Sequence, residues 1–300
     1  MVAVSGMTYS EQAFLLGQRK TLVCIATQPV TPRTADGPAV VILNAGIIHR
    51  VGPNRMSVKL ARALASAGVP VLRFDLSGIG DSESRADGLS PLEANLSDIR
   101  EVLDGLAARG ATRFVLLGLC SGADYSVAYG ADDPRVAGLV LLDPSIPKTF
   151  RFHFNHYARR VADSRSWRNA LAGKNRLLRS LASRMTREPD HAGSEQEAGA
   201  LTVDSPEVRE YLEKAYGKVL ARGGRIMAVL TAGLQTRHNY REQLTEAFPR
   251  LNFGTNLSLH YFERSDHEFT AETDQVRLID QVVSWIATES FPEVGHAASS

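Results

Sequence analysis

The sequence predicts an α/β protein with a mostly parallel sheet flanked by helices. Short, wholly apolar segments such as 39–43 and 136–142 fit strands that are buried on both faces. Between such segments, apolar residues recur at helical spacing, as in 56–67. The 300 residues are 44% hydrophobic and 22% charged, enough for one large or two modest globular domains. Alternating strands and helices of this kind predict a sheet that helices cover on both faces.

The expected elements follow one another in a regular order. The chain opens with a hairpin of residues 13–16 and 21–27, which Gly17–Lys20 separates, and a loop follows to Gly37. The remaining expected strands are 39–43, 69–74, 114–117, 136–142, 225–230 and 257–262. The expected helices are 56–67, 91–106, a helix that follows Gly118–Ala123, 240–248 and 276–286. Ser90, Pro91 and Glu93 form a capping-box start for the second of these helices.

The regular alternation stops between about Pro144 and Arg222. Residues 148–187 hold eleven Lys or Arg side chains and one acidic residue, Asp163. We expect a helical lid here, inserted into one core rather than forming a second domain. The expected division of the chain is a first core part at 1–145, the lid insertion at 146–222, a second core part at 223–290 and a flexible tail at 291–300.

Composition narrows the classes of function. The 34 Lys and Arg balance 33 Asp and Glu, so the net charge of +1 argues against a nucleic-acid-binding protein. No apolar run approaches the roughly 18 residues that span a bilayer, and the first residues lack the pattern of a signal peptide. The two cysteines make no disulfide framework, and no Cys/His cluster has zinc-ligand spacing. We expect a soluble, cytoplasmic protein without a metal or other cofactor.

The segment Gly118–Ala123 carries the strongest chemical signal. Its sequence GLCSGA has the form G-x-nucleophile-x-G and lies between an expected strand and an expected helix. Glycines two residues before and after the centre permit a turn so sharp that larger side chains would collide with backbone. The central residue is Cys120, which makes it the candidate nucleophile; the alternatives are a small buried Cys120 and Ser121 as the nucleophile. Cys24, in the middle of an apolar strand, is expected in the core.

With these motifs the chain resembles the α/β-hydrolase superfamily over residues 21–286, with a lid inserted after the sixth strand. The loop Asp75–Ser82 is similar to the D-x-x-G-x-G-x-S loop common there. Segments 45–52, 71–75 and 118–123 resemble the hydrolases associated with exosortase and acyl-ligase gene clusters. The resemblance implies an α/β-hydrolase fold and the chain order nucleophile, acid, histidine.

That order implies His267 as the general base, because it follows the last expected strand and precedes the last helix. The other histidines, His238 among them, are interpreted as lid, surface or strand residues. Most relatives carry the acid in the loop that corresponds to 231–239, which holds no carboxylate here, so Asp143 at the end of the preceding strand is the candidate acid. An amide such as Asn239, or a dyad without an acid, remains the alternative.

The same resemblance implies the oxyanion hole, which the backbone N–H groups of Ser121 and of Gly46 or Ile47 are expected to form. His49 follows the first expected parallel strand and is expected to line the mouth of the substrate pocket. Phe152 and Trp167 are aromatic residues of the expected lid and are expected to cover an acyl chain; the alternative is that they pack against the sheet. A cysteine in this turn is typical of acyl transfer, as in proteins similar to polyhydroxyalkanoate synthases and dienelactone hydrolases. We therefore expect an acyl hydrolase or acyltransferase acting on a thioester, ester or lactone through a Cys-His-Asp triad. The preferred donor is a small acyl substrate on coenzyme A or an acyl carrier protein. The alternative is a non-catalytic protein of the same fold that binds a ligand or a partner.

Overall fold

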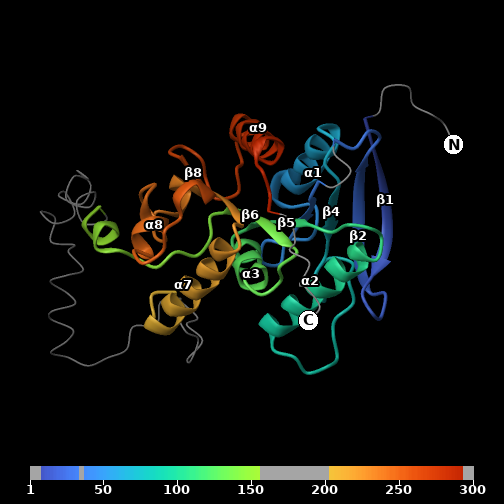
Figure 1. The fold of residues 1–300 in the computed structure, drawn as a ribbon, viewed down its shortest axis with the longest axis horizontal. Helices are drawn as coiled ribbons and strands as arrows, with labels where there is room; N and C mark the ends of the chain where they lie inside the picture. The colour runs from blue at the N-terminus through green and yellow to red at the C-terminus, as the bar shows by residue number, and fades with distance from the viewer. Residues whose placement is uncertain (1–7, 34–36, 156–202, 293–300) are drawn as a thin grey trace, which may run out of the picture.

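The computed structural model describes residues 8–33, 37–155 and 203–292, and in these residues eight strands form one sheet. The strand order is β1-β2-β4-β3-β5-β6-β7-β8 (Figure 1). β1 pairs with β2 and β2 with β4 in antiparallel fashion, and every other neighbouring pair is parallel. The predicted fold class, a mostly parallel sheet flanked by helices, is confirmed.

The bounds of the elements follow the predicted alternation. The strands are β1 (Tyr9–Leu16), β2 (Leu22–Pro29), β3 (Ala39–Ile42), β4 (Val71–Phe74), β5 (Phe114–Leu119), β6 (Val136–Leu142), β7 (Arg225–Thr231) and β8 (Leu257–Phe262). The α-helices that lie wholly within the described residues are α1 (Met56–Ser66), α2 (Pro91–Ala107), α3 (Ser121–Gly130), α7 (Pro206–Ala221), α8 (Gln243–Ala247) and α9 (Glu272–Thr288). Short 3₁₀ turns are η1 (Pro53–Arg55), η2 (Ala232–Leu234) and η3 (Gly254–Asn256).

Two helical layers cover the sheet. Helices α1 and α9 lie on one face, and α2, α3 and α7 lie on the other (Figure 1). Each face has its own apolar cluster: Leu60 and Val282 belong to the first, and Leu103, Val127 and Tyr216 belong to the second. The strands between them are buried on both faces, and all seven residues of β6 are buried. A strand covered by helices on both faces has no solvent-exposed side chains, which explains why its sequence is continuously apolar.

Local sequence signals explain where α2 begins. The Ser90 hydroxyl accepts a hydrogen bond from the Glu93 N–H, and the Glu93 carboxylate accepts one from the Ser90 N–H. Pro91 occupies the first turn, where its missing N–H leaves no bond unmade. The predicted capping box is thus confirmed.

Two segments differ from the sequence-based expectation. Helix α8 covers Gln243–Ala247 rather than 240–248, because the Gln243 side chain folds back and accepts a hydrogen bond from the Asn239 N–H. Helix α7 lies inside the range expected for the lid, yet it packs against α3 and places Tyr216 in the core. The middle of the expected lid, 156–202, lies outside the described residues, so the lid stays a prediction.

The order of the strands defines where a ligand site is expected. From β3 the chain moves to β4 on one side, then crosses to β5 on the other side of β3. Parallel sheets bind ligands beyond the carboxyl ends of the strands at such a reversal. The loop after β3 and the turn after β5 meet at this point, and the latter contains Cys120.

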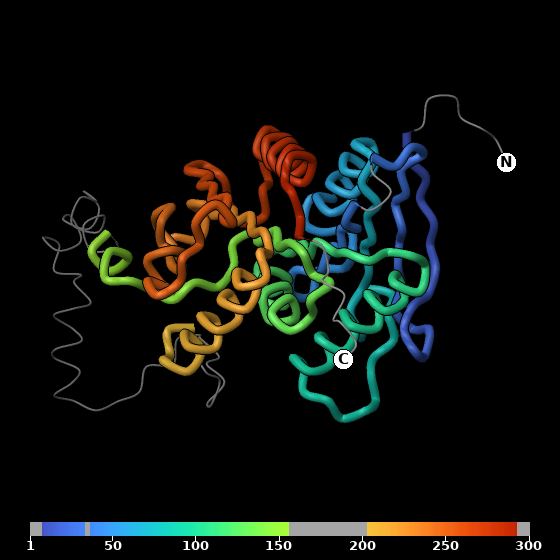
Figure 2. Tube along the Cα trace, in the orientation of Figure 1, coloured from blue at the N-terminus to red at the C-terminus, as the bar shows by residue number. Residues whose placement is uncertain are grey.

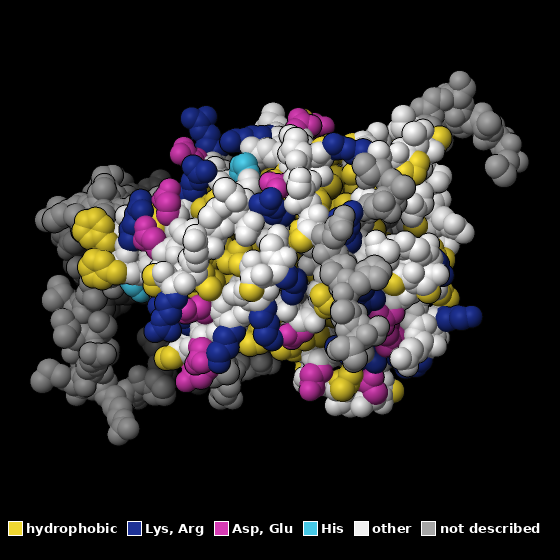
Figure 3. All heavy atoms as spheres, viewed as in Figure 1, with side chains coloured by type: hydrophobic (Ala, Val, Ile, Leu, Met, Phe, Trp, Pro, Cys, Tyr) yellow, Lys and Arg dark blue, Asp and Glu magenta, His cyan; other side chains and the backbone are white. Residues whose placement is uncertain are grey.

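The antiparallel hairpin and the β8 edge lie at opposite ends of the molecule, with the β3–β6 region between them (Figure 2). On the face seen in Figure 3, basic and acidic side chains are interspersed rather than collected by sign. In the described part of the chain, no helix has the length and apolarity needed to cross a membrane.

Candidate active site

The turn between β5 and α3 is sterically strained at Cys120. Its backbone has φ 56° and ψ −122°, a left-handed conformation that favours glycine. A Cβ atom at Gly118 would lie 2.1 Å from the carbonyl carbon of Gly122, and one at Gly122 would lie 2.5 Å from the Asn44 carbonyl oxygen. The two glycines are therefore required by backbone contacts, as the sequence predicts. Strain of this kind at a half-buried thiol is typical of functional sites.

Asp143 and His267 meet beside this turn. Asp143 follows β6 directly, with φ 46°, and its N–H donates to the Val229 carbonyl of β7. One carboxylate oxygen, Oδ2, lies 2.8 Å from His267 Nδ1. The carboxylate also accepts hydrogen bonds from the N–H and the hydroxyl of Thr231, at 2.6 and 2.7 Å. These bonds fix a fully buried carboxylate against the imidazole.

The ionisation of the three groups is coupled. Hydrogen bonding to Asp143, and next to Cys120, raises the pKa of His267 to about 9. Hydrogen bonding to His267, reinforced by the charge of Arg237, lowers the pKa of the Cys120 thiol although burial opposes this. Burial alone would raise the pKa of Asp143, but its histidine and threonine partners hold it below the usual value. The arrangement favours a thiolate beside an imidazolium.

His238 was expected in the lid or on the surface, and this expectation is wrong. Its side chain is fully buried, and Nε2 lies 3.1 Å from Asp143 Oδ1, the oxygen that His267 does not contact. Among the described residues neither ring nitrogen of His238 has a partner with hydrogen-bond geometry, so the contact with Asp143 is electrostatic. The His238 N–H donates to the Leu234 carbonyl of η2 at 3.0 Å, and residue spacing alone does not indicate that the side chain is buried there. Asp143 therefore lies between two imidazoles.

The loop after β7 also places Arg237 and Asn239. Arg237 Nη1 lies 3.6 Å from Cys120 Sγ, a contact that the sequence did not suggest. The Asn239 side-chain amide donates to the Phe152 carbonyl at 2.9 Å. The partner of His267 Nδ1 is thus the Asp143 carboxylate. The Asn239 amide, the alternative partner, is bonded to the Phe152 carbonyl instead. Asp266 accepts a hydrogen bond from the Thr270 N–H and stabilises its own loop.

The expected oxyanion donors lie on two adjoining loops. The Gly46 N–H donates to the Ser121 hydroxyl at 2.8 Å, so the two loops are joined directly. Ser121 is the first residue of α3, where backbone N–H groups have no partner within the helix. Ile47 is 92% exposed at the tip of the turn. The Gly46 N–H and Ser121 therefore lie side by side, and the Gly46 N–H is already bonded to the Ser121 hydroxyl.

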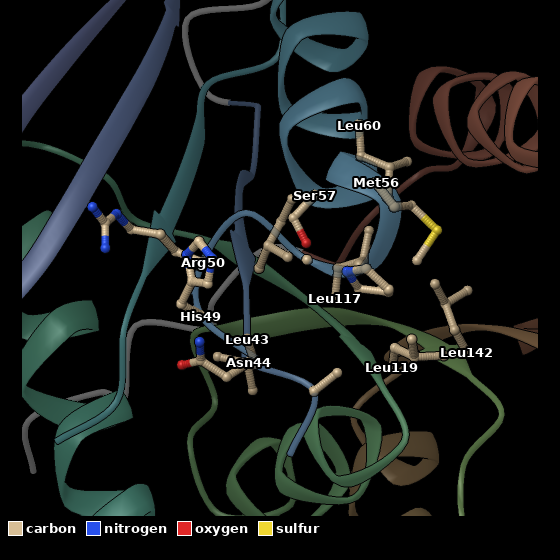
Figure 4. Close-up of a pocket in the computed structure, with 14 residues that line it drawn as sticks. Leu43, Asn44, His49, Arg50, Met56, Ser57, Leu60, Leu117, Leu119 and Leu142 are labelled. Carbon is tan, nitrogen blue, oxygen red and sulfur yellow. The ribbon is translucent and has the colours of Figure 1, made fainter. Parts of the chain in front are cut away.

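A buried polar network holds the loop after β3. Asn44 donates to Asp75 and to the Ile48 carbonyl, and its own oxygen accepts from the Leu76 N–H. Arg50 forms an ion pair with the same Asp75, which has no exposed surface. Beside this network lies a small cavity that apolar residues of α1, β5 and β6 also line (Figure 4). The network fixes the backbone that presents Gly46.

The three expected substrate-binding residues have different outcomes. His49 is exposed and lines the cavity of Figure 4. Phe152 is buried, packs edge-on against His153 and uses its carbonyl to bind Asn239. Trp167 lies outside the described residues. Of the three, His49 alone combines a described position on the loop after β3 with an exposed side chain.

Comparison with known proteins agrees with this architecture. The hypothetical protein PA1622 from Pseudomonas aeruginosa PAO1 matches with 19% identity and a TM-score of 0.54, covering 92% of this chain and 98% of that one. The Pyrococcus furiosus esterase Pf2001 matches with 11% identity and a TM-score of 0.56, covering 96% and 93%. DcsB, solved in complex with its substrate analogue, matches with 15% identity and a TM-score of 0.53, covering 93% and 99%. At these identities the likeness concerns the fold.

A search of curated proteins finds no match in sequence. The family model described as "Alpha/beta hydrolase family" matches residues 47–298, which is most of the chain. The match includes the turn at Cys120, the end of β6 and the loop of His267. The chain belongs to the alpha/beta hydrolase family.

Proposed function

We propose that the protein is an acyl hydrolase or acyltransferase with Cys120 as nucleophile, His267 as general base and Asp143 as the orienting acid. The observation that carries the proposal is the connected series of contacts: the strained thiol, the imidazole hydrogen-bonded to it, and the carboxylate 2.8 Å from the other ring nitrogen. Nucleophile, base and orienting group in this relation are the recognisable parts of covalent acyl transfer.

The reaction proceeds in two steps. The Cys120 thiolate attacks the carbonyl carbon of an activated acyl group, and the carbonyl electrons move to oxygen. Collapse of this intermediate expels the leaving group, which takes the proton from His267, and leaves an acyl thioester on Cys120. His267 then removes a proton from water, an alcohol or an amine as it attacks the thioester, and the thiolate is released.

The oxyanion is stabilised at the start of α3. The Ser121 N–H donates to it, and the positive end of the helix favours the developing charge. Because Ser121 Oγ accepts from Gly46 N–H, its own hydrogen is free to point toward the oxyanion. The Gly46 N–H then stabilises the oxyanion indirectly, because it polarises the Ser121 hydroxyl that donates to the oxyanion.

An acyl thioester is the preferred substrate class, with coenzyme A or an acyl carrier protein as its carrier. A thiolate exchanges readily with a thioester, since the bond formed and the bond broken are alike. The non-catalytic alternative is favoured by one observation: the loop after β7, where most relatives carry the acid, has no carboxylate.

Intact-mass spectrometry after incubation with an acyl thioester tests the proposal. We expect an acyl adduct on the wild-type protein and on Cys24→Ala, and none on Cys120→Ala. Cys24 is the matched control because it is buried in β2, where burial raises the pKa of its thiol to about 12. Full turnover by Cys120→Ala, or no adduct and no turnover with any ester or thioester, would overturn it.

A further inference from the structure

Arg237 is a cation beside the candidate nucleophile that the reaction described above does not use. Its Nη1 lies 3.6 Å from Cys120 Sγ, and its side chain is exposed. Within the described residues the guanidinium makes no ion pair with a carboxylate. A guanidinium has five N–H donors, so a single contact to sulfur leaves most of them available.

The backbone of Arg237 is held firmly. Its N–H donates to the Leu234 carbonyl at 2.8 Å, and its carbonyl accepts from Gln243 Nε2 at 2.9 Å. Gln243 is fully buried, and so is His238, the residue that follows Arg237. A fixed backbone with an exposed side chain places the guanidinium at the site, where no described carboxylate forms an ion pair with it and the Cys120 thiolate is its neighbouring anion.

Two acidic side chains of the site, Asp124 and Asp143, are engaged by other partners. Asp124, in the first turn of α3, lies within electrostatic range of Arg237, but its two oxygens accept from the N–H and hydroxyl of Ser145 at 2.8 and 2.7 Å. Asp143 is committed to Thr231 and the two histidines. The position of Arg237 thus offers a fork of donors to an incoming anion.

We propose that Arg237 selects acyl substrates that carry a carboxylate close to the scissile carbonyl. This inference rests on the proposed function of the same site. A guanidinium binds a carboxylate through two parallel hydrogen bonds of about 2.8 Å. Since Nη1 lies 3.6 Å from the attacking sulfur and would lie about 2.8 Å from a bound carboxylate oxygen, that carboxylate lies a few carbon–carbon bonds from the carbon under attack. Short dicarboxylic acids activated at one end fit this spacing.

The first experiment requires no turnover. Iodoacetate and iodoacetamide alkylate Cys120 by the same displacement of iodide. They differ in the group bonded to the reacting carbon, which is a carboxylate in iodoacetate and a neutral amide in iodoacetamide. We expect the rate ratio of iodoacetate to iodoacetamide to fall about 10- to 100-fold in Arg237→Gln, in line with the loss of a charged hydrogen bond. Arg237→Lys, which keeps the charge but loses the fork, is expected to lie between the two.

Arg241→Gln is the matched control, because it removes the same charge from the same loop while its guanidinium binds the Leu259 carbonyl. It is expected to retain the wild-type ratio. If Arg237→Gln slows both reagents equally, Arg237 acts on the thiolate alone and the proposal is wrong.

The second experiment uses succinyl and butyryl thioesters of one thiol. We expect Arg237→Gln to lower kcat/KM for the succinyl substrate by about 10- to 100-fold more than for the butyryl substrate. An equal fall for both would contradict the proposal. If neither substrate is turned over by the wild-type protein while the alkylation ratio still depends on Arg237, the proposed reaction fails but the anion site stands.

Discussion

The loops after β6 and β7 leave neighbouring strands at the same edge of the sheet, yet they bring opposite charges to the site. The first supplies a buried carboxylate, Asp143, and the second supplies Arg237 and His238. Both loops approach the imidazole of His267 or the thiol of Cys120. The difference teaches that two adjacent strand ends divide the work in this chain: the end of β6 brings the carboxylate to the imidazole, and the loop after β7 brings a cation to the thiol. The following changes test this division, from the largest expected effect to the smallest.

Replacing Asp143 by Asn is expected to have the largest effect. The amide keeps the shape of the side chain but removes the charge that orients His267 and stabilises its protonated form. We expect kcat for thioester turnover to fall by about 10³- to 10⁴-fold, the loss typical of removing the acid of a triad. Asp266→Asn, adjacent to His267 in sequence, is expected to change kcat only a few-fold. If kcat falls less than tenfold in Asp143→Asn, Asp143 is not the acid that orients His267.

The pH dependence of Cys120 labelling sharpens the electrostatic side of the comparison. The ion pair persists above the lowered thiol pKa and below the imidazole pKa of about 9. His267→Ala removes the largest cause of the lowered thiol pKa, so the midpoint of iodoacetamide labelling should shift upward. At pH 7 the labelling rate should fall about tenfold for each unit by which the shifted thiol pKa exceeds 7. An unchanged midpoint would mean that Arg237, in the loop after β7, lowers the thiol pKa without His267.

Gly233→Ala tests how the loop after β7 supports the histidine. A Cβ atom there would lie 2.6 Å from the Asp266 Cα and 2.7 Å from the His267 nitrogen, both backbone atoms that cannot turn aside. We expect kcat/KM to fall about 10- to 100-fold, since small displacements of a catalytic group are costly. The matched control is Gly217→Ala in α7, where the nearest atom is a leucine methyl at 3.6 Å. Similar activity in both variants would show that this support is dispensable.

His238→Gln is expected to have the smallest effect. The Asp143 carboxylate loses a partner that lowers its pKa, so that pKa should rise. We expect kcat/KM at neutral pH to fall a few-fold and its acidic limb to shift to higher pH. His260→Gln in β8 is the control, because the His260 ring bonds to Ser258 and makes no hydrogen bond or ion pair with Asp143, Cys120 or His267 among the described residues. An unshifted limb would make His238 a packing residue only.

Sequence reasoning predicts what depends on strand ends and misses what depends on loop geometry. The periodicity of the strands places Cys120 and Asp143 at the ends of β5 and β6, and the structure brings them together with His267. Cys24 is buried in β2, as predicted. Arg237 and His238 were missed because they follow the irregular turn η2, where one side chain is exposed and the next is buried and no helical or strand spacing applies. The hydrogen bond from Gly46 to Ser121 likewise needs two loops in place.

The left-handed backbone of Cys120 has a consequence for how the protein can be stabilised. A residue held in such a conformation costs about 1 to 3 kcal/mol, and glycine would relieve most of it. Selection for thermal stability alone would therefore favour the substitution Cys120→Gly, which gives a better-folded protein with no thiol at the turn. Stability and thiol reactivity therefore favour different residues at position 120. A selection for thermostable variants that does not also measure activity is expected to lose the Cys120 thiol.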